Sequence, residues 1–227
     1  MYDWFQGLVK ALEKAAGWVP ALLSATGITL SLTVLAVSCG LVISIFLALG
    51  KMSKVKVLQR FSSAYVFFFR GTPLLMQLFF IYYGLPYIHP SLTIQDRFLA
   101  AWIAYALNSG AYLAEIIRAA LQSIDKGQFE ASKVLGMTYG QTMRLIIIPQ
   151  SIRRLIPPVG NEFIMVIKDT SLVSSIALVD LMKKTSQIMS SSASALVYLP
   201  AMVIYLVITA VFTWVFNRLE KKFSVYQ

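Results

Sequence analysis

The chain has 227 residues, of which 58% are hydrophobic and only 13% are charged. Soluble domains are about half apolar and a quarter charged, so this composition indicates a protein embedded in lipid. A single Cys and a single His exclude a disulfide framework and a metal-ligand cluster within one chain. The formal charge of +10 fits an orientation signal that meets anionic membrane lipid, and we predict no nucleic-acid binding.

The start of the chain predicts a short amphipathic helix on the membrane surface. Charged residues stand there among apolar residues that recur at helical spacing. The apolar residues are Trp4, Phe5, Leu8, Val9 and Leu12. We interpret residues 1–19 as this surface helix, residues 20–217 as one transmembrane domain and residues 218–227 as a cytoplasmic tail. The apolar stretch begins too late and is too long for a cleaved signal peptide.

Five segments are long and apolar enough to cross a bilayer, which needs roughly 20 residues per helix. They are residues 22–50, 61–86, 98–118, 155–171 and 194–217. With five spans the two termini lie on opposite sides, and most Lys and Arg residues fall on the side of the C-terminus. The positive-inside rule therefore predicts an outside N-terminus and a cytoplasmic C-terminus.

Small residues repeat along the first predicted span and permit a neighbouring helix to approach closely. They are Gly27, Ala36, Gly40, Ala48 and Gly50. We interpret them as packing residues.

The second span is interrupted by the run Arg70-Gly71-Thr72-Pro73. Because Pro73 lacks an N–H and clashes with the preceding turn, we predict a kink or break there, with Thr72 as the cap of a new half-helix and Pro73 at its first position. A half-helix N-terminus at membrane depth suits a carboxylate, so we hypothesise that Gly71 and Thr72 contact the substrate. A kink needed only for packing is the alternative.

Polar groups in the next two spans are further candidates, because such groups are costly in lipid. Glu115 and Arg118 lie on one helical face, either toward a substrate or as an intrahelical ion pair. In the fourth span Glu162 follows Pro157-Pro158, a run that predicts an irregular start with backbone groups open to a cavity. The candidate substrate contacts are Arg70, Gly71, Thr72, Asn108, Glu115, Asn161 and Glu162.

Three embedded charges, Arg70, Glu115 and Glu162, are expected to pair, because an unpaired buried charge is costly. We predict that Arg70 neutralises one carboxylate. The other carboxylate could then meet a substrate ammonium or a cationic side chain.

The segment 122–154 predicts a protruding cytoplasmic elbow of two short amphipathic helices broken at Gly136. Pro149 would begin the helix that follows. This elbow resembles binding-protein-dependent ABC importer permeases, whose pattern is E-A-A, three residues, G, nine residues and I-x-L-P. The matching residues are Glu130-Ala131-Ser132, Gly136, Ile146 and Ile148-Pro149, with Ser132 and Ile148 as the two departures.

Other stretches resemble the polar-amino-acid branch of that family, and the resemblance covers roughly residues 20–215. They are residues 69–75, 109–118, 160–163 and 168–172. The resemblance implies an all-α, MetI-like transmembrane domain of about five helices in a multi-pass protein of the bacterial plasma membrane. The implied function is the permease subunit of an importer for a polar or cationic amino acid such as arginine, histidine, lysine or glutamine.

The resemblance also implies partners and coupling residues. Two copies of an ATPase subunit would bind ATP and Mg, an external substrate-binding protein would deliver cargo, and we expect a second, identical permease copy. The residues expected to couple to the ATPase are Glu130, Ala131, Gly136, Ile146 and Pro149.

The chain itself carries no G-x-x-x-x-G-K-[ST] motif and no nucleophile–base pair, so we predict neither a cofactor nor a metal nor an enzymatic activity in this subunit. The alternative is an ion-coupled secondary transporter, which would show internal repeats and would not need the elbow.

Overall fold

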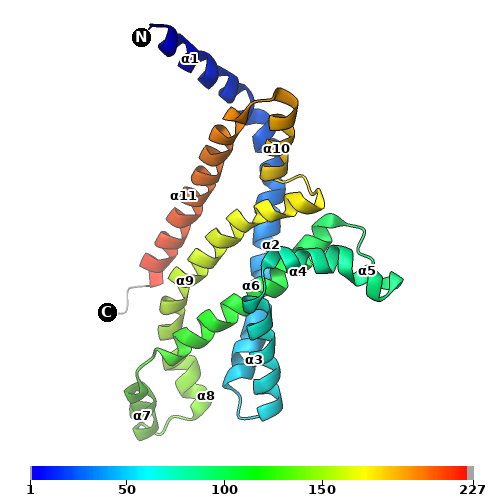
Figure 1. Ribbon diagram of the computed structural model, residues 1–227. Helices are drawn as coiled ribbons and strands as arrows, with labels where there is room; N and C mark the ends of the chain where they lie inside the picture. The colour runs from blue at the N-terminus through cyan, green and yellow to red at the C-terminus, as the bar shows by residue number, and fades with distance from the viewer. Residues whose placement is uncertain (1, 224–227) are drawn as a thin grey trace.

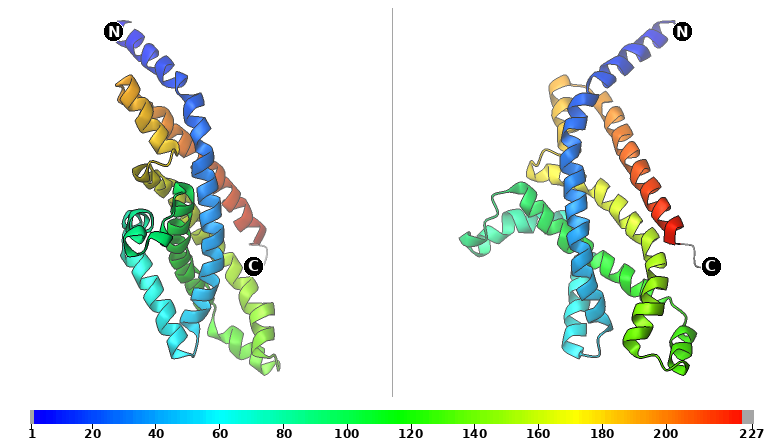
Figure 2. Two further views of the ribbon diagram at one scale, coloured as in Figure 1. Left: turned by 90° about the vertical axis from the view of Figure 1, so that its right-hand side faces the viewer. Right: turned by 180° about the vertical axis from the view of Figure 1, so that it is seen from behind.

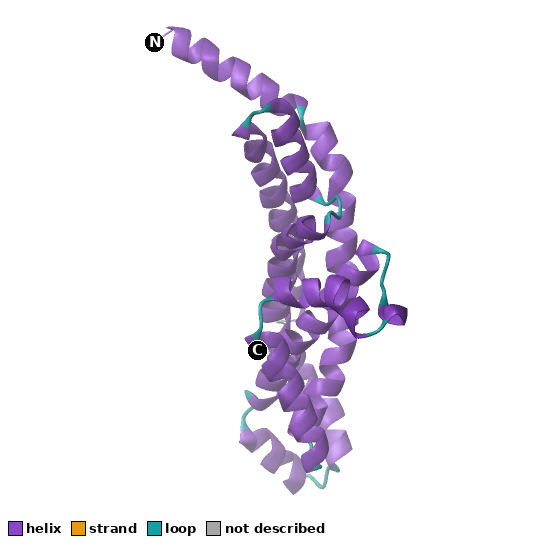
Figure 3. Ribbon diagram, turned by 45° about the vertical axis from the view of Figure 1, so that its right-hand side comes forward, coloured by secondary structure: helices purple, strands orange, loops and turns teal. Residues whose placement is uncertain are grey.

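The computed structural model describes the backbone of residues 2–223 and the side chains of residue 6 and of residues 9–223. Helices joined by short loops make up this part of the chain, and it contains no strand (Figure 3). The predicted all-α fold is therefore confirmed. In chain order the elements are α1 Tyr2–Gly17, α2 Val19–Met52, α3 Lys56–Gly71, α4 Leu74–Phe79, the π-helix η1 Phe80–Gly84, α5 Leu85–Ile88, the 3-10 helix η2 Pro90–Leu92, α6 Arg97–Gln122, α7 Lys126–Val134, α8 Tyr139–Thr142, the π-helix η3 Met143–Ile147, α9 Ile148–Asp169, the 3-10 helix η4 Thr170–Ile176, α10 Leu181–Ser192, the 3-10 helix η5 Ala195–Val197 and α11 Tyr198–Phe223.

The long helix α2 runs along the length of the molecule (Figure 1). Helices α3, α7 and α8 gather at one end, and α1 and α10 lie at the opposite end (Figure 2). The segment from α4 to α5 lies crosswise to α2 near the middle. The predicted elbow and helix α10 thus occupy opposite ends of the molecule.

Two of the described helical segments are long and apolar enough to cross a membrane, Val19–Met52 and Ala195–Phe223. The segments Lys56–Gly71 and Leu74–Ile88 qualify only as a pair, which is bent by 103° at the break. Helices α6 and α9 are 26 and 22 residues long but more polar. Five spans and an outside N-terminus therefore stay predictions.

The predicted surface helix at the start of the chain corresponds to α1, which diverges from the line of α2 (Figure 2). Val9 and Leu12 are exposed on it. The side chains of Trp4, Phe5 and Leu8, which belong to the predicted apolar face, lie outside the described residues, as do residues 224–227 of the predicted tail. A location on the membrane surface stays a prediction.

The centre of the bundle is the contact of α2 with α6. A Cβ atom on Gly40 would lie 3.0 Å from the Gly110 backbone nitrogen, so only glycine allows this approach. Ala36 and Ala48 are fully buried, which confirms their packing role. Gly27 is exposed and a Cβ there would touch nothing within 4 Å, so within the described residues it makes no close helix contact of the kind predicted.

Helix α9 begins earlier than predicted and passes through Pro157 and Pro158 without a break. The expected irregular start at these prolines is wrong, because neighbouring helices and local adjustments can satisfy the carbonyls that a proline leaves free. Pro149 stands in the first turn of α9, where no N–H is needed, and its predicted position is confirmed. One continuous helix therefore connects the elbow to the middle of the molecule.

Candidate functional site: a pocket at a helix break

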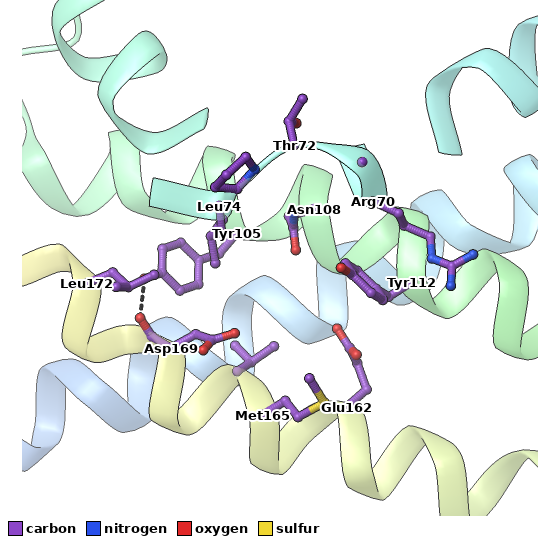
Figure 4. A pocket seen from close by; sticks show the side chains of 13 residues that line it. Arg70, Thr72, Leu74, Tyr105, Asn108, Tyr112, Glu162, Met165, Asp169 and Leu172 are labelled. Carbon is purple, nitrogen blue, oxygen red and sulfur yellow. Dashed lines mark hydrogen bonds between the residues drawn. The ribbon is translucent and has the colours of Figure 1, made fainter. Parts of the chain in front are cut away.

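A pocket of about 410 Å³ opens at the break between α3 and α4. Helices α6 and α9 and the start of η4 form its other walls (Figure 4). Its lining consists of Arg70, Gly71, Thr72, Pro73, Leu74, Tyr105, Asn108, Tyr112, Glu162, Met165, Val166, Asp169 and Leu172. A concave site of this volume, with a few convergent polar groups, suits a small polar ligand.

The break itself follows from Pro73. In a continuous helix the Phe69 carbonyl would accept from the amide of residue 73, which proline lacks. The chain turns by 103° at this point, so the predicted break is confirmed.

The predicted capping role of Thr72 is wrong. Thr72 ends α3 as its C-cap, and Pro73, in place of Thr72, precedes α4. The Thr72 amide and hydroxyl both donate to the Phe68 carbonyl, at 3.1 and 2.8 Å, because that carbonyl lies within reach one turn earlier. The amide of Leu74 opens α4, and no described backbone carbonyl accepts from it.

Two buried amide side chains brace the break. Gln77 Nε2 donates to the Phe69 carbonyl at 2.9 Å and to the Thr72 carbonyl at 3.0 Å. Asn108 Nδ2, from α6, donates to the Phe69 carbonyl and to Gln77 Oε1, both at 3.0 Å. These bonds satisfy the carbonyl that Pro73 leaves without its helical partner.

Helix α6 turns Tyr105, Asn108 and Tyr112 toward the pocket, since these positions share one helical face. The Tyr105 hydroxyl donates to the Asp169 carbonyl at 2.5 Å and so ties α6 to the end of α9. The Arg70 guanidinium lies 5.2 Å from the centre of the Tyr112 ring, which is a cation–π contact.

Helix α9 brings two carboxyl groups to the pocket. Glu162 and Asp169 are two turns apart on the face that also carries Met165 (Figure 4). Glu162 is only 7% exposed and faces Ser109 of α6. In the described part of the chain no Lys, Arg or His forms a salt bridge with either acid.

The structure brings five of the seven predicted substrate contacts to this pocket: Arg70, Gly71, Thr72, Asn108 and Glu162. Within residues 2–223 no salt bridge joins Arg70 to a carboxylate, although Arg70 interacts electrostatically with Glu162 across the pocket, so a direct ion pair of Arg70 is not formed. The reason is geometric: the end of α3 places the guanidinium over the Tyr112 ring.

Glu115 lies outside the pocket, in an ion network between α2 and α6. Its carboxylate pairs with Lys51 from the last turn of α2, and Arg118 Nη2 donates to its other oxygen at 2.7 Å. The intrahelical ion pair of Glu115 with Arg118 is confirmed, and Lys51 adds a second cation that sequence reasoning did not find.

Asn161 also points elsewhere. It lines a small cavity of about 80 Å³ between α9 and α11, together with Thr213, Asn217 and Glu220. A helix of 3.6 residues per turn sends adjacent side chains in different directions, so Asn161 and Glu162 cannot face the same space.

Sequence reasoning missed three polar residues of the pocket, namely Asp169, Tyr105 and Tyr112. Asp169 carried a signal: it follows Glu162 by seven positions, which is two turns of one helix face. The two tyrosines gave no sequence signal except that they lie on the same face of α6 as Asn108, because Tyr is common in buried helices.

The elbow has the predicted form. Helix α7 ends at Val134, Gly136 adopts φ +73, and Thr138 with Gln141 forms a capping box at the start of α8. The positive φ is the conformation for which glycine is suited, so the role of Gly136 in the turn is confirmed.

The elbow also exposes apolar side chains. Val134, Leu135, Tyr139 and Leu145 are between 64% and 87% exposed. Of the expected coupling residues, Glu130, Ala131, Gly136 and Pro149 are exposed and Ile146 is half-buried. Exposed apolar side chains that gather at one end of a molecule are typical of a protein contact.

A helical membrane domain, a pocket at a broken helix and an elbow with an apolar surface together define a transport permease. The chain belongs to the family described as binding-protein-dependent transport system inner membrane component, which it matches over residues 40–225.

Curated and solved relatives agree with this class. The chain is 41% identical to the L-cystine transport system permease protein TcyB of Bacillus subtilis, over 87% of this chain and 84% of that protein. A solved structure described as an amino acid ABC transporter with histidines superposes with a TM-score of 0.84 at 40% identity, over 91% of this chain and 96% of the other. A chain of the MetNI methionine ABC transporter superposes with a TM-score of 0.74 at 20% identity, over 89% of this chain and 96% of that one, which confirms the MetI-like fold.

Proposed function

We propose that this chain is the permease subunit of an ATP-driven importer of polar or cationic amino acids, and that it crosses the bacterial plasma membrane several times. Family membership supports the permease role. The relatives named above are an L-cystine permease and an amino acid transporter with histidines, which supports an amino acid as cargo.

The observation that carries the proposal is that groups of opposite charge line opposite walls of one pocket. Arg70 and the unpartnered amide of Leu74 lie beside the helix break, whereas the carboxyl groups of Glu162 and Asp169 come from α9 on the opposite wall. An amino acid also carries both charges. Its carboxylate would bind at the break and its ammonium on the α9 side.

The balance of charge favours a cationic cargo. Two carboxyl groups and one guanidinium line the pocket, which leaves one acidic group in excess. After one carboxylate is matched with the ammonium, the other can hold the side chain of arginine, lysine or histidine. Glutamine remains a weaker candidate, because its side chain carries no charge.

The group proposed to bind the substrate carboxylate is Leu74, two residues after Thr72, which the sequence suggested. Gly71 and Thr72 line the pocket, but the Thr72 amide already donates to Phe68. The amide of Leu74, a residue that lines the pocket, is left available by the break. We therefore place the substrate carboxylate between Leu74 and Arg70.

Coupling to the ATPase would occur through the elbow. Its exposed apolar residues have no partner surface within the described chain, and Glu130 and Ala131 stand on the same short helix. Two ATPase subunits, each with bound ATP and Mg, would bind two elbows, one from each of two identical permease copies. An external binding protein would deliver the amino acid, and ATP-driven closure of the ATPases would alternate access to the pocket.

The test is ATPase activity of the reconstituted complex with its binding protein, measured with a panel of arginine, lysine, histidine and glutamine. We expect cationic amino acids to stimulate hydrolysis several-fold. Agmatine, which is arginine without its carboxylate, should stimulate poorly because it cannot use the helix break. Equal stimulation by agmatine would contradict the carboxylate contact, and full transport without any ATPase would favour an ion-coupled transporter instead.

A further inference from the structure

The amide side chain of Gln77 can adopt only one orientation. It is 6% exposed, and its nitrogen lies within hydrogen-bond distance of the Phe69 carbonyl, the Thr72 carbonyl and Thr72 Oγ1. The Thr72 hydroxyl gives its proton to Phe68, so it too acts as an acceptor toward Gln77. Reversing the amide would set an oxygen against three acceptors, which is strongly unfavourable.

This orientation determines that of Asn108. Gln77 Oε1 must face α6, where it can only accept, so Asn108 must present its nitrogen. Both Nδ2 protons are then used, on Gln77 Oε1 and on the Phe69 carbonyl. An asparagine amide is ordinarily ambiguous, but here the chain of donors and acceptors leaves one assignment.

The remaining atom is Asn108 Oδ1, and it points into the pocket (Figure 4). No described residue donates a hydrogen bond to it. The pocket wall at this point therefore offers an acceptor and no donor.

Asn108 also lies directly behind the break, since it bonds the Phe69 carbonyl. A ligand carboxylate held at Leu74 and Arg70 would bring its own α-carbon next to Asn108. The substituent of that carbon with protons to donate is the α-ammonium.

We infer that Gln77 and Asn108 form an amide relay that selects ligands with an α-ammonium, because it holds Asn108 Oδ1 toward the pocket as an acceptor. This inference rests on the proposed amino-acid site and deepens it. Asn108 would touch the ligand, whereas Gln77 is a positioning residue that acts only through Asn108. The relay depends on Pro73, because a proline has no N–H and the Phe69 carbonyl therefore accepts from the Gln77 and Asn108 side chains.

The experiment measures competition with radiolabelled arginine and glutamine for the permease–ATPase complex without its binding protein. Each amino acid is compared with the analogue in which hydrogen replaces the α-ammonium. In Gln77→Leu the Asn108 amide is free to rotate, so we expect the preference for the amino acid over its analogue to fall about tenfold, the effect of one charge-assisted hydrogen bond. The matched control is Gln59→Leu, at an exposed glutamine on α3 outside the pocket, which should keep the preference of the unaltered protein.

A rescue variant separates orientation from general damage. In Gln77→Leu/Asn108→Asp, an acceptor faces the pocket in either rotamer, and the preference should return. A defect in packing alone would not respond to this change. If Gln77→Leu does not fold, Asn108→Ala should show the same loss of preference.

An unchanged preference in Gln77→Leu or in Asn108→Ala would overturn the relay. Failure of the amino-acid site itself looks different, because Glu162→Gln would then leave the binding of both radiolabelled amino acids unchanged.

Discussion

Two glutamates on neighbouring helices have different surroundings. Glu115 on α6 is held by Lys51 and by Arg118, so both carboxylate oxygens have a cation. Glu162 on α9 is more deeply buried, at 7% exposure against 16% for the Glu115 side chain, yet it forms no salt bridge in the described chain and faces a cavity. A carboxylate that the protein satisfies is a structural link, and one that it leaves open toward a pocket is available to a ligand.

The largest effect is expected from Glu162→Gln. The substitution keeps the shape but removes the charge that would hold a substrate cation, so the affinity of the assembled complex for arginine should fall about tenfold to hundredfold. Equilibrium binding with radiolabelled arginine measures it. Glu115→Gln is the matched change at the other glutamate, and it should lower thermal stability while leaving arginine affinity within about twofold. The reverse pattern would show that the two roles have been assigned wrongly.

Lys51→Met should produce the next largest effect, now on stability. It leaves Glu115 with Arg118 alone in a half-buried position, and we expect a loss of about 2 kcal/mol in unfolding free energy. Thermal unfolding of the purified complex checks this. Adding Glu115→Gln to Lys51→Met removes the uncompensated carboxylate and should recover part of the loss. A strictly additive double variant would mean that the two side chains do not interact.

A smaller effect is expected from Gly40→Ala. The added methyl group would lie 3.0 Å from the Gly110 nitrogen and 3.2 Å from the Ala106 carbonyl oxygen, so α2 and α6 must separate slightly. A cost of about 1 kcal/mol is expected from such overpacking. The matched change Gly27→Ala, at an exposed glycine of the same helix, should have no such cost. Equal melting temperatures for the two variants would show that the approach of α2 to α6 is not tight.

Local features of the sequence predicted local features of the fold. The break at Pro73 and the turn at Gly136 were predictable because each follows from the backbone chemistry of one residue. The unbroken course of α9 through Pro157 and Pro158 was not, since neighbouring helices decide whether a proline ends a helix.

Partnerships between distant residues were beyond the reach of one sequence. Lys51 and Glu115 are 64 positions apart, and nothing in either segment identifies the other as its partner. The same holds for Gln77 and Asn108, whose bond exists only because α4 turns back against α6. Five pocket residues were nevertheless found, because polar residues in apolar segments are rare enough to identify.

The continuous helix α9 gives the molecule a lever. Its 22 residues span about 33 Å, with Pro149 beside the elbow at one end and Asp169 in the pocket at the other. The helix joins the elbow to the pocket through one continuous stretch of backbone, while α2 and α6 are held together by the Gly40–Gly110 contact and by the Lys51–Glu115 ion pair. A movement of the elbow would therefore shift the two carboxyl groups of α9 toward the helix break or away from it. In the proposed transport cycle, such a shift would couple ligand binding and release to the ATPase subunits.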